Sequence, residues 1–204
     1  VRAFIPLFIA NAVFWSLFQQ IFTVLAVYSD ERMNWSIFGW TAPSSWIGSI
    51  EPVWIILLSP LFALMWTKLG RRAPTTPRKF AYGVIGMGLA FMLFLTMAGS
   101  SGRTVPVLVV VAILAVFAVS ELMLSPIGLS VTTQLAPNAF RAQMMALYFF
   151  SVGLGTSMSG VLARYYDPDR EAAYFGIIGA VAVVVGVIVW FLAPWVSRLM
   201  EGVH

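Results

Sequence analysis

The chain alternates long apolar runs with short polar breaks. Each run meets or exceeds the roughly 20 apolar residues that a membrane-spanning helix needs. The six runs cover residues 3–28, 45–68, 79–99, 105–135, 140–164 and 172–197. Charged residues, glycine and proline gather in the breaks, as is typical of turns. The pattern therefore predicts an all-α integral membrane protein with six transmembrane helices.

Composition agrees with the apolar pattern and excludes several kinds of site. Hydrophobic residues make up 60% of the chain and charged residues 10%, with a mean hydropathy of +0.91, which excludes a soluble domain of this size. The absence of cysteine excludes disulfides and thiolate metal sites. His204 is the single histidine and the last residue, and one histidine cannot organise a metal site or a catalytic triad. We expect no metal and no cofactor.

Basic residues divide unevenly between the two sides of the predicted membrane. If both termini share a side with the second and fourth breaks, that side carries Arg2, Lys68, Arg71, Arg72, Arg78, Lys79, Arg141 and Arg198. The other side carries Arg32, Arg103, Arg164 and Arg170 beside five acids. The positive-inside rule then makes the first side cytoplasmic. The segment 68–72 is thus an orientation signal, with a contact to anionic lipid or nucleic acid as the alternative.

One carboxylate stands in the middle of the fourth run. Glu121 lies well inside residues 105–135, where a charge costs about 3 kcal/mol at the bilayer centre. Such residues usually face a protein interior or a wet cavity and serve ion or substrate pathways. A buried, protonated glutamate with a structural role is the alternative. Glu51, beside the helix-kinking Pro52, is a second intramembrane carboxylate.

Polar residues recur at helical spacing in only some of the runs. One face of the first run carries Ser16, Gln19 or Gln20, and Thr23, and one face of the fourth carries Glu121, Ser125, Gly128 and Thr132. The third and sixth runs have almost no polar residue in their central thirds. We therefore expect the first, second, fourth and fifth helices to line a wet cavity. The other two are expected to be lipid-facing or purely packed, as an outer layer.

The fifth run is rich in small residues from Ser151 to Gly160, a composition that lets membrane helices approach closely. We interpret these residues as packing positions and not as ligands. Tyr148 precedes them as a large amphipathic side chain. It is a candidate pocket residue, with plain core packing as the alternative.

Three stretches together resemble a known family. They are residues 4–9 with Phe14-Trp15 and Gln19-Gln20, residues 51–72, and residues 120–130 with 135–137 and Met144-Met145. The order of these motifs resembles the C-terminal half of the proton-coupled oligopeptide transporters of the major facilitator superfamily. The resemblance implies the C-terminal six-helix bundle of a major-facilitator-type fold over residues 1–204.

The resemblance also implies roles for individual residues. Glu121 matches a glutamate that helps hold the amino terminus of the peptide. Gln19 falls where many bacterial members have a glutamate implicated in proton coupling, and Tyr148 where many have a tryptophan lining the pocket. Glu51 falls where an asparagine commonly contacts the peptide. Gln20 and Ser125 would complete the substrate-binding pocket.

The missing carboxylate at position 19 and the added one at position 51 suggest an exchange of roles. Our hypothesis is that Glu51 takes over part of the proton-coupling or amine-binding charge, with Glu51 and Glu121 facing one cavity. The alternative is that Glu51 merely caps its helix near the outer interface.

The function implied by the resemblance is symport of di- and tripeptides with protons into the cell, by alternating access. Expected partners are small peptides, protons, the lipid bilayer and a missing N-terminal six-helix half, and no nucleic acid. The chain starts at Val1 and lacks the family's Glu-x-x-Glu-Arg motif, so we expect a fragment, or less readily a natural half-length protein. The expected location is the bacterial cytoplasmic (inner) membrane, with both termini of the segment cytoplasmic.

Three other functions compete with peptide symport. The altered positions 19, 51 and 148 fit a carrier of a single amino acid or another small solute. A non-transporting membrane subunit would tolerate neutral replacement of the intramembrane carboxylates. An intramembrane enzyme is disfavoured, because the chain has no His-Glu-x-x-His, no Gly-x-Ser-x-Gly and no paired aspartates within the apolar runs.

Overall fold

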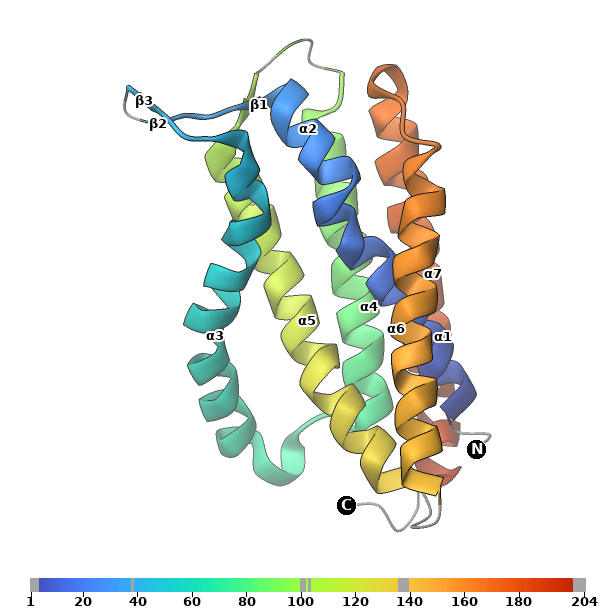
Figure 1. The fold of residues 1–204 in the computed structure, drawn as a ribbon. Helices are drawn as coiled ribbons and strands as arrows, with labels where there is room; N and C mark the ends of the chain where they lie inside the picture. The colour runs from blue at the N-terminus through green and yellow to red at the C-terminus, as the bar shows by residue number, and fades with distance from the viewer. Residues whose placement is uncertain (1–3, 38, 100–101, 103, 136–139, 200–204) are drawn as a thin grey trace.

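Six helical spans, each long and apolar enough to cross a membrane, make up the computed structural model of the chain (Figure 1). The structure describes residues 4–37, 39–99, 102, 104–135 and 140–199. The first span joins α1 (Phe4–Phe18), a 3-10 turn η1 (Gln19–Phe22) and α2 (Val24–Arg32). The others are α3 (Ile47–Leu69), α4 (Thr76–Leu93), α5 (Val107–Leu135), α6 (Arg141–Ala163) and α7 (Glu171–Leu199). The predicted all-α membrane architecture is confirmed.

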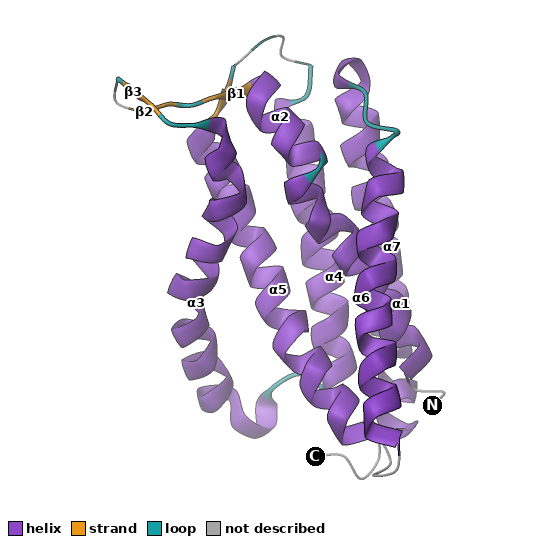
Figure 2. Cartoon of the chain, viewed as in Figure 1, coloured by secondary structure: helices purple, strands orange, loops and turns teal. Residues whose placement is uncertain are grey.

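Very short strands lie at one end of the bundle (Figure 2). β1 (Met33–Asn34) pairs in parallel with β4 (Val105–Pro106), and β2 (Ser36–Ile37) pairs antiparallel with β3 (Trp40–Thr41). Gly39, with φ at 85°, makes the turn of this hairpin, a conformation that costs glycine little. Segments of two residues are too short to show strand periodicity, so the apolar pattern predicted only loops here.

The connections alternate between the two ends of the bundle, as the predicted topology requires. The start of α1, the end of α7, the α3–α4 connection, the end of α5 and the start of α6 share one end, and the hairpin and the α6–α7 connection lie at the other (Figure 1). The first of these, here called the basic end, includes Lys68, Arg72, Arg78, Lys79, Arg141 and Arg198. The predicted break at Pro137-Asn138 and the residues Arg2, Arg103 and His204 lie outside the described residues.

The packing centre is the contact between α4 and α7, which lets the two backbones touch. A Cβ on Gly88 would lie 2.7 Å from the carbonyl oxygen of Gly179, and a Cβ on Gly179 would lie 2.8 Å from that of Gly88. Such close approach maximises van der Waals contact, which drives helix association in membranes. α4 also packs against α5 and α1. α4 is therefore packed against three helices, and its expected place in an outer layer relative to a wet cavity stays a prediction.

The least buried spans are α3 and α6. Only 11% of the residues in the apolar stretch of α3 are buried and 22% in α6, against 61% in the first span. α6 packs on α1, where a Cβ on Gly155 would collide with the carbonyl oxygen of Ala12. α3 lies beside α5 and stands apart from the rest of the bundle (Figure 1). The bundle thus has a tightly packed side at α4 and α7. The side where α3 lies beside α5 is loosely packed and is called the open side below.

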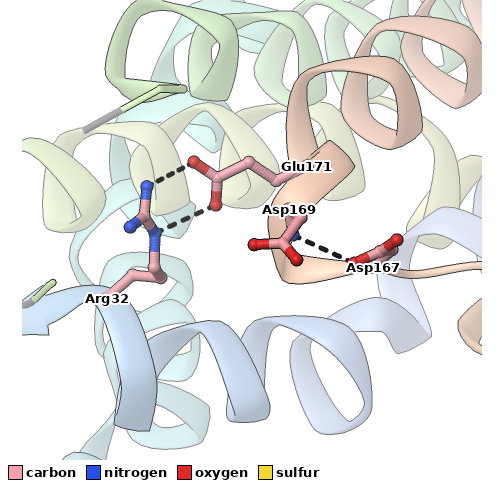
Figure 3. A network of polar contacts seen from close by, with 4 residues as sticks. All are labelled: Arg32, Asp167, Asp169 and Glu171. Atoms are coloured by element: carbon pink, nitrogen blue, oxygen red, sulfur yellow. Dashed lines mark hydrogen bonds and ion pairs between the residues drawn. The ribbon is translucent and has the colours of Figure 1, made fainter. Parts of the chain in front are cut away.

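A buried ion pair closes the end opposite the basic end (Figure 3). Arg32, the last residue of α2, donates from Nε to Glu171 Oε2 at 3.1 Å and from Nη2 to Glu171 Oε1 at 2.6 Å. Glu171 begins α7, after a turn in which the Asp169 backbone N–H donates to Asp167 Oδ1 at 3.0 Å. The pair joins elements 139 residues apart, so sequence spacing gave no signal of it.

Candidate functional site

Two carboxyl groups meet on the open side of the bundle. Glu51 comes from α3 and is only 4% exposed, while Glu121 comes from α5 and is half-buried. The two carboxyl groups lie close enough to interact directly. An ionised carboxylate only accepts hydrogen bonds, so a hydrogen bond between the two needs a proton on one of them. Glu51 Oε1 has no hydrogen-bond partner among the described residues.

The start of α3 explains how Glu51 reaches Glu121. Trp46 occupies the N-cap position and makes no capping bond with its side chain, and Glu51 lies beyond the first turn of the helix. The alternative of a helix-capping glutamate therefore has no support in the structure. Pro52 follows directly and removes one backbone N–H from the helix ladder. Trp54 then ties α3 to α5, because its Nε1 donates to the Val111 carbonyl at 3.0 Å.

Ser125 and Tyr148 lie next to Glu121. Ser125 is one turn further along α5, and the hydroxyl of Tyr148, from α6, makes a polar contact with it and is close enough to Glu121 to feel its charge. Tyr148 itself is 5% exposed. Gly128 provides the room for it, since a Cβ at that position would lie 2.9 Å from Cε2 and 3.2 Å from the hydroxyl of Tyr148. Four of the predicted site residues, Glu51, Glu121, Ser125 and Tyr148, thus form one cluster.

Gln19 lies outside this cluster. It is half-buried in η1, and its Nε2 donates weakly to Thr156 Oγ1 of α6 at 3.5 Å. This is the one side-chain hydrogen bond that the described part of the chain gives it. Gln19 keeps spare donors and acceptors on a partly exposed surface, so it remains a predicted pocket residue on the first span.

Gln20 has a different environment from its neighbour, with 0% exposure. Its Nε2 donates to the carbonyls of Ser16 at 3.3 Å and Ser159 at 3.4 Å. Its Oε1 accepts from the Thr23 hydroxyl at 3.1 Å and from the Tyr174 hydroxyl at 3.1 Å. These bonds occupy the amide fully and hold η1 against α6 and α7. We therefore leave Gln20 out of the proposed pocket and assign it to packing.

The carboxyl pair does not line either of two hollows in the described part of the bundle. A cavity of about 10 Å³ below Tyr148 is lined by α1, α4, α5 and α6, and a hollow of about 180 Å³ lies under the hairpin, around Asp30 and Trp35. Neither Glu51 nor Glu121 lines either one. The pair belongs instead to the open side formed by α3 and α5. Chemically, it can hold or release a proton, or accept hydrogen bonds from an ammonium group.

Comparison with known proteins places the chain among transporters. A model of the POT family matches residues 1–190. The chain is 42% identical to an uncharacterised transporter, YclF, of Bacillus subtilis, and 35% identical to a di-/tripeptide transporter of Lactococcus lactis subsp. cremoris. Each alignment covers the whole of this chain and 42% of the relative.

A solved structure agrees with these sequence relatives. The crystal structure of a peptide transporter POT (E310Q mutant) in complex with alafosfalin superposes with a TM-score of 0.92 at 44% identity. The match covers 98% of this chain and 41% of that one. The chain thus spans about two fifths of the length of the relatives it matches. It is a multi-pass membrane protein and belongs to the POT family of peptide transporters.

Proposed function

We propose that this chain supplies the C-terminal six-helix half of a carrier that moves di- and tripeptides into the cell together with protons. The observation that carries the proposal is the close approach of Glu51 in α3 and Glu121 in α5 on the open side of the bundle. Support comes from the di-/tripeptide transporter among the relatives and from the share of their length that the chain covers, near two fifths. Many carriers are built from two such helical repeats around a midplane site.

The carboxyl pair is proposed to couple proton and substrate. With one proton between them, Glu51 and Glu121 attract and hold α3 against α5. Without it, two carboxylates at hydrogen-bonding distance repel. The ammonium group at the amino terminus of a peptide donates hydrogen bonds and carries a positive charge, so it can replace the shared proton. In this scheme Ser125 and Tyr148 position Glu121, and Gln19 lies further along the pocket wall.

The carboxylate end of a peptide needs a cation from elsewhere. Arg32 is already bonded to Glu171, and Lys79 Nζ lies 4.0 Å from the ring centre of Trp66. No other lysine or arginine falls within the central parts of the six spans that the structure describes. We therefore propose that a second, N-terminal helical half faces the open side and supplies this charge.

Orientation follows from the charges at the two ends. We propose that the basic end is cytoplasmic, by the positive-inside rule, and that the membrane is the bacterial inner membrane. Both ends of the described chain would then lie on the cytoplasmic side. Tagging either end and probing its access to an impermeant reagent in intact cells tests this assignment.

The decisive experiment is uptake of a labelled tripeptide by the complete polypeptide in proteoliposomes, with and without an inward proton gradient. We expect gradient-driven accumulation by wild type and its loss in Glu121→Gln and Glu51→Gln. Glu31→Gln is the matched control, because it makes the same chemical change at an exposed acid outside the cluster.

Each outcome selects one of the competing functions. Wild-type accumulation with an unchanged Glu51→Gln would remove Glu51 from proton coupling. Competition by free amino acids, with no accumulation of tripeptide, would favour the small-solute carrier. A well-inserted protein that transports neither, and whose carboxylates tolerate replacement, would be the non-transporting subunit.

A further inference from the structure

A small cavity lies between the carboxyl cluster and the basic end. Its volume is about 10 Å³, and its walls come from α1, α4, α5 and α6. The lining residues are Phe4, Leu7, Phe8, Asn11, Phe80, Gly128, Thr132, Tyr148 and Ser151. A space of this size fits one water molecule and no larger ligand.

Asn11 presents an unpartnered acceptor in this cavity. The residue is 1% exposed, and its Nδ2 donates to Ser151 Oγ at 2.7 Å. The Ser151 hydroxyl donates its own proton to the Tyr148 carbonyl at 2.6 Å, so it can only accept a hydrogen bond from Asn11. This fixes the amide orientation, with the NH₂ group toward Ser151. Asn11 Oδ1 is then left without a hydrogen-bond partner among the described residues.

Two further polar groups line the same cavity. The Thr132 hydroxyl donates to the Gly128 carbonyl at 2.7 Å and retains lone pairs for an incoming donor. The Tyr148 hydroxyl both donates and accepts, and it lies 3.2 Å from the position of a Cβ on Gly128, another lining residue. The cavity thus combines one unmet acceptor with two groups of spare capacity. Buried waters in proteins typically make about three hydrogen bonds to such groups.

We propose that this cavity binds one water molecule, which donates to Asn11 Oδ1 and links it to Thr132 and Tyr148. The remaining walls are apolar and consist of the rings of Phe4, Phe8 and Phe80 and the side chain of Leu7. Burying an amide oxygen without a partner is unfavourable, and the water removes that penalty.

The bound water also fixes the Tyr148 hydroxyl. Tyr148 stands between the cavity and the Ser125–Glu121 side of the cluster. A water tied to Asn11 therefore makes α1 a positioning element for Tyr148, although Asn11 itself lies away from the carboxyl pair. This second part rests on the proposed function, because it treats Tyr148 as a residue of the peptide pocket.

The test is a structure of the complete protein at a resolution that shows ordered water. We expect a water at about 2.7–3.2 Å from Asn11 Oδ1. In Asn11→Leu, which keeps the bulk and removes the acceptor, the water should be lost and the Tyr148 hydroxyl displaced from Ser125. Ser151→Ala is the matched control, since it removes the other hydrogen bond of Asn11 and should leave the water in place.

Transport kinetics test the positioning role of Asn11 separately from the water site. Asn11→Leu should raise the KM for tripeptide several-fold with the maximal rate unchanged, and Ser151→Ala should leave both unchanged. A dry cavity in wild type overturns the water site whatever uptake shows, and does so even if Asn11→Leu fails to fold. If an ordered water is present and Asn11→Leu has the same KM as wild type, the water site stands and the positioning role of Asn11 is overturned. Neither result bears on whether peptides are carried.

Discussion

Two buried acidic side chains in this bundle join helices in different ways. Glu171 at the start of α7 is met by Arg32 through two hydrogen bonds, so its charge is balanced and both of its oxygens are bonded (Figure 3). Glu51 in α3 is met by another acid, Glu121, and one of its oxygens has no partner among the described residues. In the first contact the protein itself supplies both charges. The second, as proposed above, depends on a proton shared between the two acids.

The Arg32–Glu171 contact is structural, whereas the contact between Glu51 and Glu121 can change. Arg32 and Glu171 hold α2 to α7, on the tightly packed side that includes the α4–α7 contact. Glu51 and Glu121 hold α3, the least buried span, to α5. A loosely packed helix attached through such a contact suits the carrier proposed above, in which helices must move. The following predictions test this contrast, from the largest expected effect to the smallest.

Removing one member of the ion pair should have the largest effect. Arg32→Met leaves Glu171 buried without its cation, and we expect a loss of about 3–5 kcal/mol in the free energy of unfolding. Thermal unfolding of the purified protein in detergent measures it. The double variant Arg32→Met/Glu171→Leu should recover most of the loss, because no unpaired charge remains. A double variant as unstable as the single one would show that the pair does more than balance charge.

The carboxyl pair should respond differently to neutral replacement. Glu51→Gln supplies a permanent N–H donor to Glu121, so the contact between α3 and α5 no longer needs a proton. We expect its stability to stay within about 1 kcal/mol of wild type. Glu51→Leu, which offers no donor, should cost about 1–3 kcal/mol by leaving Glu121 unsatisfied. Equal unfolding temperatures for the two variants would contradict a hydrogen-bonded joint.

A smaller effect is expected at the other tie between α3 and α5. Trp54→Phe keeps the aromatic bulk and removes the indole N–H that donates to Val111. One neutral hydrogen bond is worth about 0.5–1.5 kcal/mol, and a value near the lower limit is expected because the helical carbonyl keeps its backbone partner. Thermal unfolding reports the loss, with Trp40→Phe as a control at an exposed position. A cost as large as that of Glu51→Leu would make Trp54 the main anchor of α3.

The smallest effect is predicted at Tyr166, in the α6–α7 connection near Glu171. Its buried hydroxyl has no hydrogen-bond partner among the described residues, so Tyr166→Phe loses no hydrogen bond and should not lower stability at neutral pH. Burial, and then the charge of Glu171, raise the pKa of Tyr166 above its usual value. The folded state therefore keeps the phenol proton after the unfolded chain begins to lose it. Its contribution to stability is intact below about pH 10 and declines as pH rises further toward the folded pKa.

The comparison of wild type with Tyr166→Phe between neutral and strongly alkaline pH measures that decline. The variant should lose less stability than wild type over this range. A parallel loss in both proteins would mean that Tyr166 is hydrated in solution.

The sequence predicted the helices better than it predicted the partners of buried groups. Apolar runs near 20 residues leave few alternatives to membrane helices, so six spans were found correctly. A period of 3.6 does not say which of two adjacent polar residues turns inward, and Gln19 and Gln20 were therefore treated alike. The pairing of Arg32 with Glu171 depends on how distant helices assemble. Apolarity also does not say which helices pack on one another, such as α4 and α7, since lipid tails and protein cores are both apolar.

The turn at Gln19–Phe22 affects the direction of every side chain beyond it. Its four residues are wound as a 3-10 helix, and Thr23 follows with φ −118° and ψ −93°. A 3-10 helix rises about 2.0 Å per residue and turns about 120°, against about 1.5 Å and 100° in an α-helix. Rewinding the four residues would shorten the first span by about 2 Å and rotate α2 by about 80° relative to α1. The hydrogen bonds of Gln20 therefore set the angular phase between the two halves of this helix, and with it the direction in which Arg32 points.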